Sequence, residues 1–140
     1  MSGRATWSGP GKGEQFWFLG TLATIKVPGE ASEGRFESYI VLEGRLTLQA
    51  GDDRFDLVPG AAAVVPMGVA HTFRVDSDSA RVLVLSTPAG LERLVRDGSV
   101  PALTSTLPPS ETPRPAPEQL EAIFRTHGQV NVGPPLSPDD

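Results

Sequence analysis

The feature that most constrains the fold of this chain is a series of short β-type segments separated by turns at regular intervals. Between residues 16 and 86 the segments are rich in aromatic and β-branched residues, which favour strands. Gly, Pro and Asp separate them, as expected of turns. Strands are predicted at 16–27 (with a break at Gly20), 36–42, 45–49, 54–58, 61–65, 69–75 and 81–86. Such spacing is typical of a β-sandwich or barrel, so the sequence predicts an all-β fold.

The last third of the chain has a different character. Segments 91–97 and 117–127 carry apolar residues at helical spacing, with Pro near the start and Gly at the end, and they predict two short helices. The proline-rich stretch 100–116 between them is interpreted as an extended surface connector or, alternatively, as a packed arm. The end of the chain from Gly133 is expected to be loose. We expect one domain over 1–140, with a core at about 14–98 and the arm and last helix at 99–140.

Composition excludes several classes of function. With 39% hydrophobic and 21% charged residues the chain has the balance of a soluble globular protein, and its net charge of -5 argues against a nucleic-acid partner. The absence of Cys excludes disulfides, thiolate metal sites and cysteine nucleophiles. No apolar run is long enough to span a membrane and no signal-peptide pattern is present. No membrane partner and a cytoplasmic location are therefore expected.

The most specific motif lies at residues 60–75. Pro66 fixes its own φ and Gly68 tolerates positive φ, so a tight corner is predicted before the strand that carries His71. The positions of Gly60, Pro66, Gly68 and His71 resemble the second conserved motif of the cupin family, G-x5-P-x-G-x2-H-x3-N. Val75 stands where that motif has Asn.

The first cupin motif, G-x5-H-x-H-x3–4-E-x6-G, is matched only in its second half, by Glu37 and Gly44. Its two histidine positions hold Glu30 and Ser32, or Ala31 and Glu33 in the shorter spacing. Glu37 is either the glutamate of this motif or a residue of the preceding strand that a deletion has placed beside Leu42-Glu43-Gly44. The resemblance covers about residues 14–98. It implies a cupin-type double-stranded β-helix, or jelly-roll barrel, with one or two short C-terminal helices.

Family resemblance also implies a metal site made by three His and one Glu, and this chain departs from that set. It has two histidines, and His127 lies on the predicted C-terminal helix. The remaining donors are His71 and Glu37, with Glu30 or Glu33 as a weak third. Because a facial-triad iron site needs at least three protein donors, we expect no metal and no cofactor.

The candidate catalytic residues are His71, Glu37 and Tyr39. Strand alternation places Glu37 and Tyr39 on one face, as it does Val69 and His71 on the second strand. His71 can donate or accept a proton near neutral pH, and the Tyr39 hydroxyl can orient a ligand oxygen. The alternative for both His71 and Tyr39 is a core position, with the tyrosine hydroxyl reaching the surface. The predicted substrate pocket consists of Trp17, Val41, Ala63, Val65, Val69 and Phe73.

The chain looks like small single-domain bacterial cupins similar to quercetin dioxygenases, and cupin-like proteins of this size serve as polyketide cyclases. The resemblance implies a metal-independent cyclase or isomerase that encloses an apolar small molecule of natural-product biosynthesis. The alternatives are a residual metal-dependent dioxygenase and a non-catalytic binding protein. Relatives commonly pair through sheet edges, so a homodimer is expected.

Overall fold

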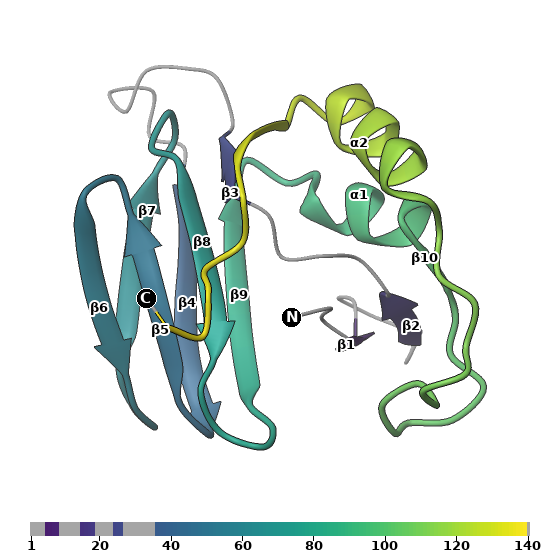
Figure 1. Cartoon of the computed structure of the whole chain (residues 1–140), viewed down its shortest axis with the longest axis horizontal. Helices are drawn as coiled ribbons and strands as arrows, with labels where there is room; N and C mark the ends of the chain where they lie inside the picture. Colours follow the sequence, from purple (N-terminus) through teal and green to yellow (C-terminus); the bar gives the residue numbers. More distant parts are fainter. Residues whose placement is uncertain (1–4, 9–14, 19–23, 27–35, 140) are drawn as a thin grey trace.

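Two antiparallel sheets packed face to face form the centre of the molecule (Figure 1). The computed structural model describes residues 5–8, 15–18, 24–26 and 36–139. The smaller sheet has the order β7–β4–β9, with bounds Ala62–Pro66, Phe36–Glu43 and Arg81–Thr87. The larger has the order β11–β3–β8–β5–β6, with bounds Val130–Gly133, Thr24–Lys26, His71–Val75, Leu46–Ala50 and Asp53–Leu57. This all-β sandwich of jelly-roll type confirms the predicted fold class.

A third, small sheet lies apart from the sandwich. It consists of β1 (Ala5–Ser8), β2 (Gln15–Phe18) and β10 (Ser99–Pro101), all antiparallel. The prediction of one interrupted strand over 16–27 was wrong, because β2 and β3 belong to different sheets. Gly20, the proposed break, lies outside the described residues. β1 and β10 were not predicted, since they are short and one of them contains proline.

Alternation along the strands fills the space between the two main sheets. The inward residues of β4 and β5 alternate with outward ones, and they form the buried core with residues from β6 and β7. The core members are Tyr39, Val41, Leu46, Leu48, Leu57 and Val65. Ala63, Val69 and Phe73 pack against this cluster. The inward face of each main sheet therefore supplies the core, although β7 and β9 also expose Val64, Leu83 and Leu85 on the outer face.

Two helices lie beside the β9 side of the sandwich (Figure 1). α1 (Leu91–Asp97) buries Leu94 and Val95, and α2 (Pro117–Thr126) buries Leu120, so both predicted helices are confirmed. The connector between β10 and α2 is largely exposed, although Pro108 is fully buried. None of the described helices is long and apolar enough to cross a membrane.

The end of the chain is packed against the larger sheet, and the prediction of a loose end was wrong. β11 pairs with β3, and Leu136 beyond it is buried. The guanidinium of Arg74 donates a hydrogen bond from Nη1 to the Ser137 carbonyl. Pairing with a strand about a hundred residues earlier is a contact that local composition does not report. A single domain over 1–140 and the homodimer stay predictions.

Candidate functional site

A tight turn presents His71 at the start of β8. Gly68 has φ of +88°, and the Val69 N–H donates to the Pro66 carbonyl at 3.3 Å, which closes the corner predicted from the sequence. The imidazole Nδ1 of His71 then lies 3.0 Å from the Val69 carbonyl oxygen. The turn therefore fixes the position of His71 and the orientation of its ring together.

Glu37 and Tyr39 reach the same place from β4, at the centre of the facing sheet. Strand alternation turns both side chains inward, and Glu37 is paired in register with Val65 on one side and Ser86 on the other. This is the face on which the sequence analysis placed them. Because β4 has a neighbour on each side, its backbone cannot shift without breaking two ladders of hydrogen bonds.

The three side chains form a hydrogen-bonded chain inside the sandwich. Oε2 of Glu37 lies 2.8 Å from the Tyr39 hydroxyl and 2.8 Å from Nε2 of His71. The side chains of His71 and Glu37 are only 6% and 12% exposed, and Tyr39 is 5% exposed. The Tyr39 ring meets the His71 ring edge-on, with centroids 6.2 Å apart. The Tyr39 hydroxyl thus points to a buried carboxylate, not to the surface as the core alternative expected.

The hydrogen-bond partners define the protonation of the site. Both ring nitrogens of His71 face oxygen acceptors, a carbonyl and a carboxylate, so both must carry a proton for both bonds to form. Burial by itself lowers the pKa of His71, but the hydrogen bonds to Glu37 and Val69 and the charge of Glu37 outweigh it, and the pKa is raised. The site therefore favours an imidazolium paired with a carboxylate.

The other two groups shift in the matching directions. Burial raises the pKa of Glu37, but the hydrogen bond and the charge of His71, with the Tyr39 hydroxyl, reverse this and lower it. Burial and the charge of Glu37 raise the pKa of Tyr39 well above its ordinary value of 10.0. At neutral pH, Tyr39 is a neutral donor and Glu37 is ionised, and the raised pKa of His71 favours its cationic form. A protonated His71 balances the charge of Glu37.

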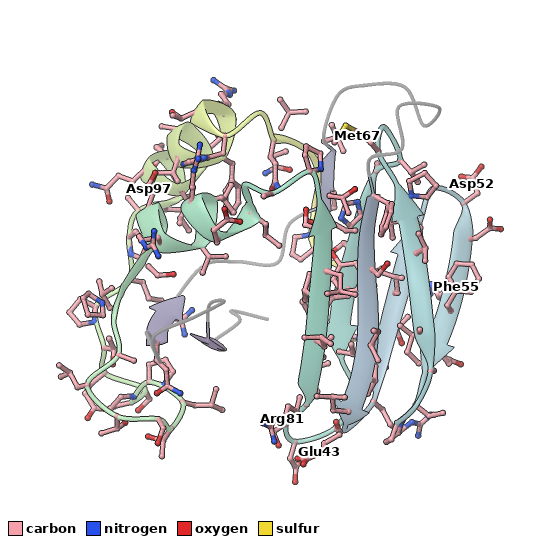
Figure 2. The ribbon with its side chains drawn as sticks, turned by 180° about the vertical axis from the view of Figure 1, so that it is seen from behind. Glu43, Asp52, Phe55, Met67, Arg81 and Asp97 are labelled. Atoms are coloured by element: carbon pink, nitrogen blue, oxygen red, sulfur yellow. The ribbon has the colours of Figure 1, made fainter. Side chains whose placement is uncertain are left out.

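A cavity of about 320 Å³ opens beside Glu37, between the end of the smaller sheet and the helices. It is lined by Phe36 and Glu37 of β4, by Val65, Pro66, Met67, Gly68 and Val69, by residues 86–91 and by Arg93, Leu94, His127, Gly128 and Gln129. In Figure 2, Met67 marks this end of the sandwich, and Glu43 and Arg81 mark the opposite end. A second cavity, of about 340 Å³, has His71 and Thr72 on its wall and Pro134, Pro135 and Leu136 along one side.

The structure places the predicted pocket residues in three different settings. Val65 and Val69 line the 320 Å³ cavity. Val41 is fully buried, and Ala63 and Phe73 pack against the core, so these three lie behind the cavity wall. Trp17 belongs to β2 in the third sheet, and its side chain is outside the described ones.

Sequence reasoning missed the part of the cavity wall formed by residues from Ser86 onward. Ser86, Arg93, Leu94, His127 and Gln129 come from β9, α1 and the segment after α2. Only His127 stood out in the sequence, and it was assigned to a distant helix. These positions meet because the helices fold back beside β9, a long-range arrangement that motif spacing does not encode.

The donors present do not fit the metal site that the cupin resemblance implies. Within the described residues no three His, Cys, Asp or Glu side chains converge on a possible metal position. His71 and Glu37 supply two donors, and both nitrogens of His71 are already in hydrogen bonds. Three protein donors are the minimum for a facial-triad iron site. Glu30, Ser32 and Glu33, which stand at the missing motif positions, lie outside the described residues.

A jelly-roll sandwich with a buried Glu–His pair at one end defines a small cupin-like barrel, and a family comparison agrees. The family model described as the cupin domain matches residues 24–88. This segment contains β3 to β9, Glu37, Tyr39 and His71. Over these residues the chain carries a cupin domain.

Individual relatives are similar over shorter stretches. An uncharacterized protein of Streptomyces coelicolor is 38% identical over 52 residues, which is 37% of this chain and 50% of that protein. The match therefore spans about half the length of this curated relative. A solved structure from Thermus thermophilus is 29% identical over 61% of this chain and 83% of its own, with a TM-score of 0.43. A cupin-2 domain protein of Shewanella frigidimarina is 19% identical over 57% of this chain and 76% of its own, with a TM-score of 0.37.

Proposed function

We propose that this protein is a metal-independent enzyme that moves a proton on a bound small molecule, as an isomerase or cyclase does. The observation that carries the proposal is the chain Tyr39–Glu37–His71, whose central residue, Glu37, lines a 320 Å³ cavity. A buried carboxylate held ionised beside a cavity is the arrangement of a general base. The size of the cavity suits a small organic molecule.

The two oxygens of Glu37 have different surroundings. Oε2 accepts the hydrogen bonds of both Tyr39 and His71, whereas Oε1 has no hydrogen-bond partner among the described residues. Oε1 is therefore the atom that we assign to accept a substrate proton and to return it at a second position. His71 keeps the carboxylate ionised, and Tyr39 is a positioning residue, since its hydroxyl reaches the carboxylate from a buried site.

The acidity of the substrate follows from the strength of the base. His71 lowers the pKa of Glu37, which keeps the base in its reactive form at neutral pH but makes it weak. A weak base suits a carbon acid that is already activated, such as a methylene group next to one or two carbonyls. Apolar walls from Val65, Met67 and Leu94 fit the carbon skeleton of such a molecule. A poly-keto or aromatic ketone substrate, as in polyketide-like biosynthesis, has this chemistry.

Hydrogen–deuterium exchange into β-tetralone, a bicyclic ketone with an activated methylene group, tests the proposal without knowledge of the natural substrate. Proton NMR in deuterated buffer should show exchange faster with the protein than without it. Glu37→Gln should lower the protein-dependent rate by about 100-fold or more, in the range of a lost general base. Glu43→Gln is the matched control, because Glu43 is exposed on the same strand at the opposite end of the sandwich (Figure 2).

Two results would contradict this assignment. If β-tetralone binds but Glu37→Gln leaves its exchange rate unchanged, Glu37 is not the base, and the protein is better described as a binding module. Metal analysis of protein purified without chelator gives the second result. Stoichiometric, tightly bound iron, nickel or zinc that is lost in His71→Ala would show a metal-dependent cupin.

A further inference from the structure

Among the charged residues that line the 320 Å³ cavity, some are in ion pairs and one is not. Glu37 at its wall is neutralised by His71 at 2.8 Å. His127 on the opposite side lies 2.7 Å from Asp97 through its Nε2 atom. Arg93 of α1 also lines the cavity, and its side chain makes no hydrogen bond or ion pair with any residue that the structure describes. Asp97, one turn further along α1, is directed to His127.

From this arrangement we infer that the molecule bound in the cavity carries an anionic group, a carboxylate or a similar oxyanion, and that Arg93 binds it. The guanidinium forms no hydrogen bond or ion pair within the described part of the chain. Its charge lowers the pKa of the neighbouring Glu92, but Glu92 does not line the cavity, so Arg93 faces the cavity with several N–H donors for an oxyanion. The apolar body of the ligand would pack on Val65, Met67 and Leu94, which lie on the same wall. What happens to the ligand afterwards rests on the proposed function of Glu37.

The overall charge of the protein supports Arg93 as the residue that binds the anionic group. With a net charge of -5 the molecule repels anions at long range, so a local cation favours the binding of an anion. Arg93 is that cation at the cavity. Because one end of the ligand would be fixed at α1 and the other would meet β4, Arg93 also sets which carbon atom lies near Glu37. We therefore assign Arg93 as a residue that determines substrate specificity.

Two fluorescent probes of one skeleton separate charge recognition from apolar binding. Anilinonaphthalene sulfonate is anionic, and N-phenyl-naphthylamine is its uncharged counterpart. Arg93→Gln should raise the dissociation constant of the sulfonate by about 5- to 10-fold, as for a lost charge-assisted hydrogen bond, and leave that of the neutral probe within about twofold. Arg96→Gln is the matched control, since Arg96 is exposed on the same helix and does not line the cavity.

The site of binding is tested by Ala89→Trp, which places an indole at the cavity wall from an exposed position. This variant should weaken both probes. Sulfonate binding that is absent in the wild type, unaffected by Ala89→Trp, or equally changed by Arg93→Gln and Arg96→Gln would overturn the assignment of Arg93. These titrations measure binding and not catalysis, so their outcome is independent of the outcome of the exchange assay on Glu37.

Discussion

Glu37 is a buried charge that the fold tolerates because His71 and Tyr39 hydrogen-bond to it. Removing one member of a buried ion pair leaves the other charge uncompensated, which is more costly than the pair itself is stabilising. Here the pair also sets the protonation of its members, because the carboxylate is the main cause that raises the pKa of His71 and His71 is a cause that lowers the pKa of Glu37. One interaction thus links folding stability to the proposed chemistry.

The pKa of His71 should fall in Glu37→Gln, because burial, which lowers it, remains while the charge and the hydrogen bond of the carboxylate are removed. NMR titration of the imidazole carbon-bound protons measures this value. The chain has two histidines, so His127→Asn assigns both signals, and the His127 signal is an internal reference. An unchanged pKa of His71 in Glu37→Gln would show that the two side chains are not paired in solution.

The same pair predicts how stability depends on pH. A raised pKa of His71 gives stability that is complete below its ordinary value of 6.5 and is lost as pH rises through the higher folded value. A lowered pKa of Glu37 gives stability that is complete above its ordinary value of 4.5 and is lost as pH falls through the lower folded value. The pair should therefore contribute most between about pH 4.5 and 6.5. Urea denaturation from below pH 4.5 to above pH 6.5 should show wild-type stability falling on both sides of this range, and the fall above pH 6.5 should be absent in His71→Asn.

At the scale of elements, two turns are hydrogen-bonded to each other at the end of the sandwich that Glu43 and Arg81 mark in Figure 2. The turn between β4 and β5 contains Gly44, with φ of +82°, and the turn before β9 packs on it. The Arg45 N–H donates to Ser77 Oγ at 2.9 Å, and the Asp76 N–H donates to the Arg45 carbonyl at 2.9 Å. The strands of both sheets are joined through these contacts.

Gly44→Ala should be clearly more destabilising than Gly60→Ala, although both glycines have positive φ. Gly60, with φ of +88°, has nothing within 4 Å of an added Cβ, so its cost is the backbone term of about 1–2 kcal/mol. At Gly44 the added Cβ would lie 2.7 Å from Ser77 Oγ and still closer to the Ser79 carbonyl, so about 2 kcal/mol or more should be added. Chemical denaturation of the two variants makes the comparison. Equal losses of stability would mean that the turns move apart at no cost.

Sequence patterns predicted most of the strands and both helices correctly, and the reasons can be named. The strands from Phe36 to Ser86 and both helices carry local signals: period-two or helical spacing of apolar residues, with Gly and Pro at their ends. The corner at Pro66–Gly68 was predictable because its backbone needs those residue types. β10, β11 and the cavity wall after β9 were not, because they depend on pairing with distant segments. For Glu37 and His71, strand alternation predicted only that each side chain points to an inward face. The sequence of neither strand determines the distance between the two sheets, so the contact itself was not predicted.

At the scale of the whole molecule, the C-terminal segment packs against the outer face of the larger sheet and is hydrogen-bonded to it. After β11 the chain crosses β8 and ends near β5 (Figure 1). Thr47 and Thr72, which point outward from β5 and β8, are only 3% and 6% exposed. Arg74 joins this layer, because it is hydrogen-bonded to Asp76 at 2.7 Å and to the Ser137 carbonyl. The segment from Pro134 to Ser137, which we call the C-terminal strap, therefore covers polar groups that would otherwise face water.

Deleting residues 134–140 should lower the free energy of unfolding by about 2–4 kcal/mol. Leu136 is 7% exposed, and burial of a leucine side chain is worth about 1.5–3 kcal/mol. The hydrogen bond from Arg74 to the strap should add about 1 kcal/mol. Deletion of residues 138–140 is the control, because it keeps Leu136 and Ser137 and should change stability by less than about 0.5 kcal/mol. Urea denaturation measures both, and equal losses for the two deletions would show that the strap does not hold the sheet. The Glu37–His71 pair should survive the longer deletion, because its partners come from β4 and β8, so the pKa of His71 measured by NMR should stay raised.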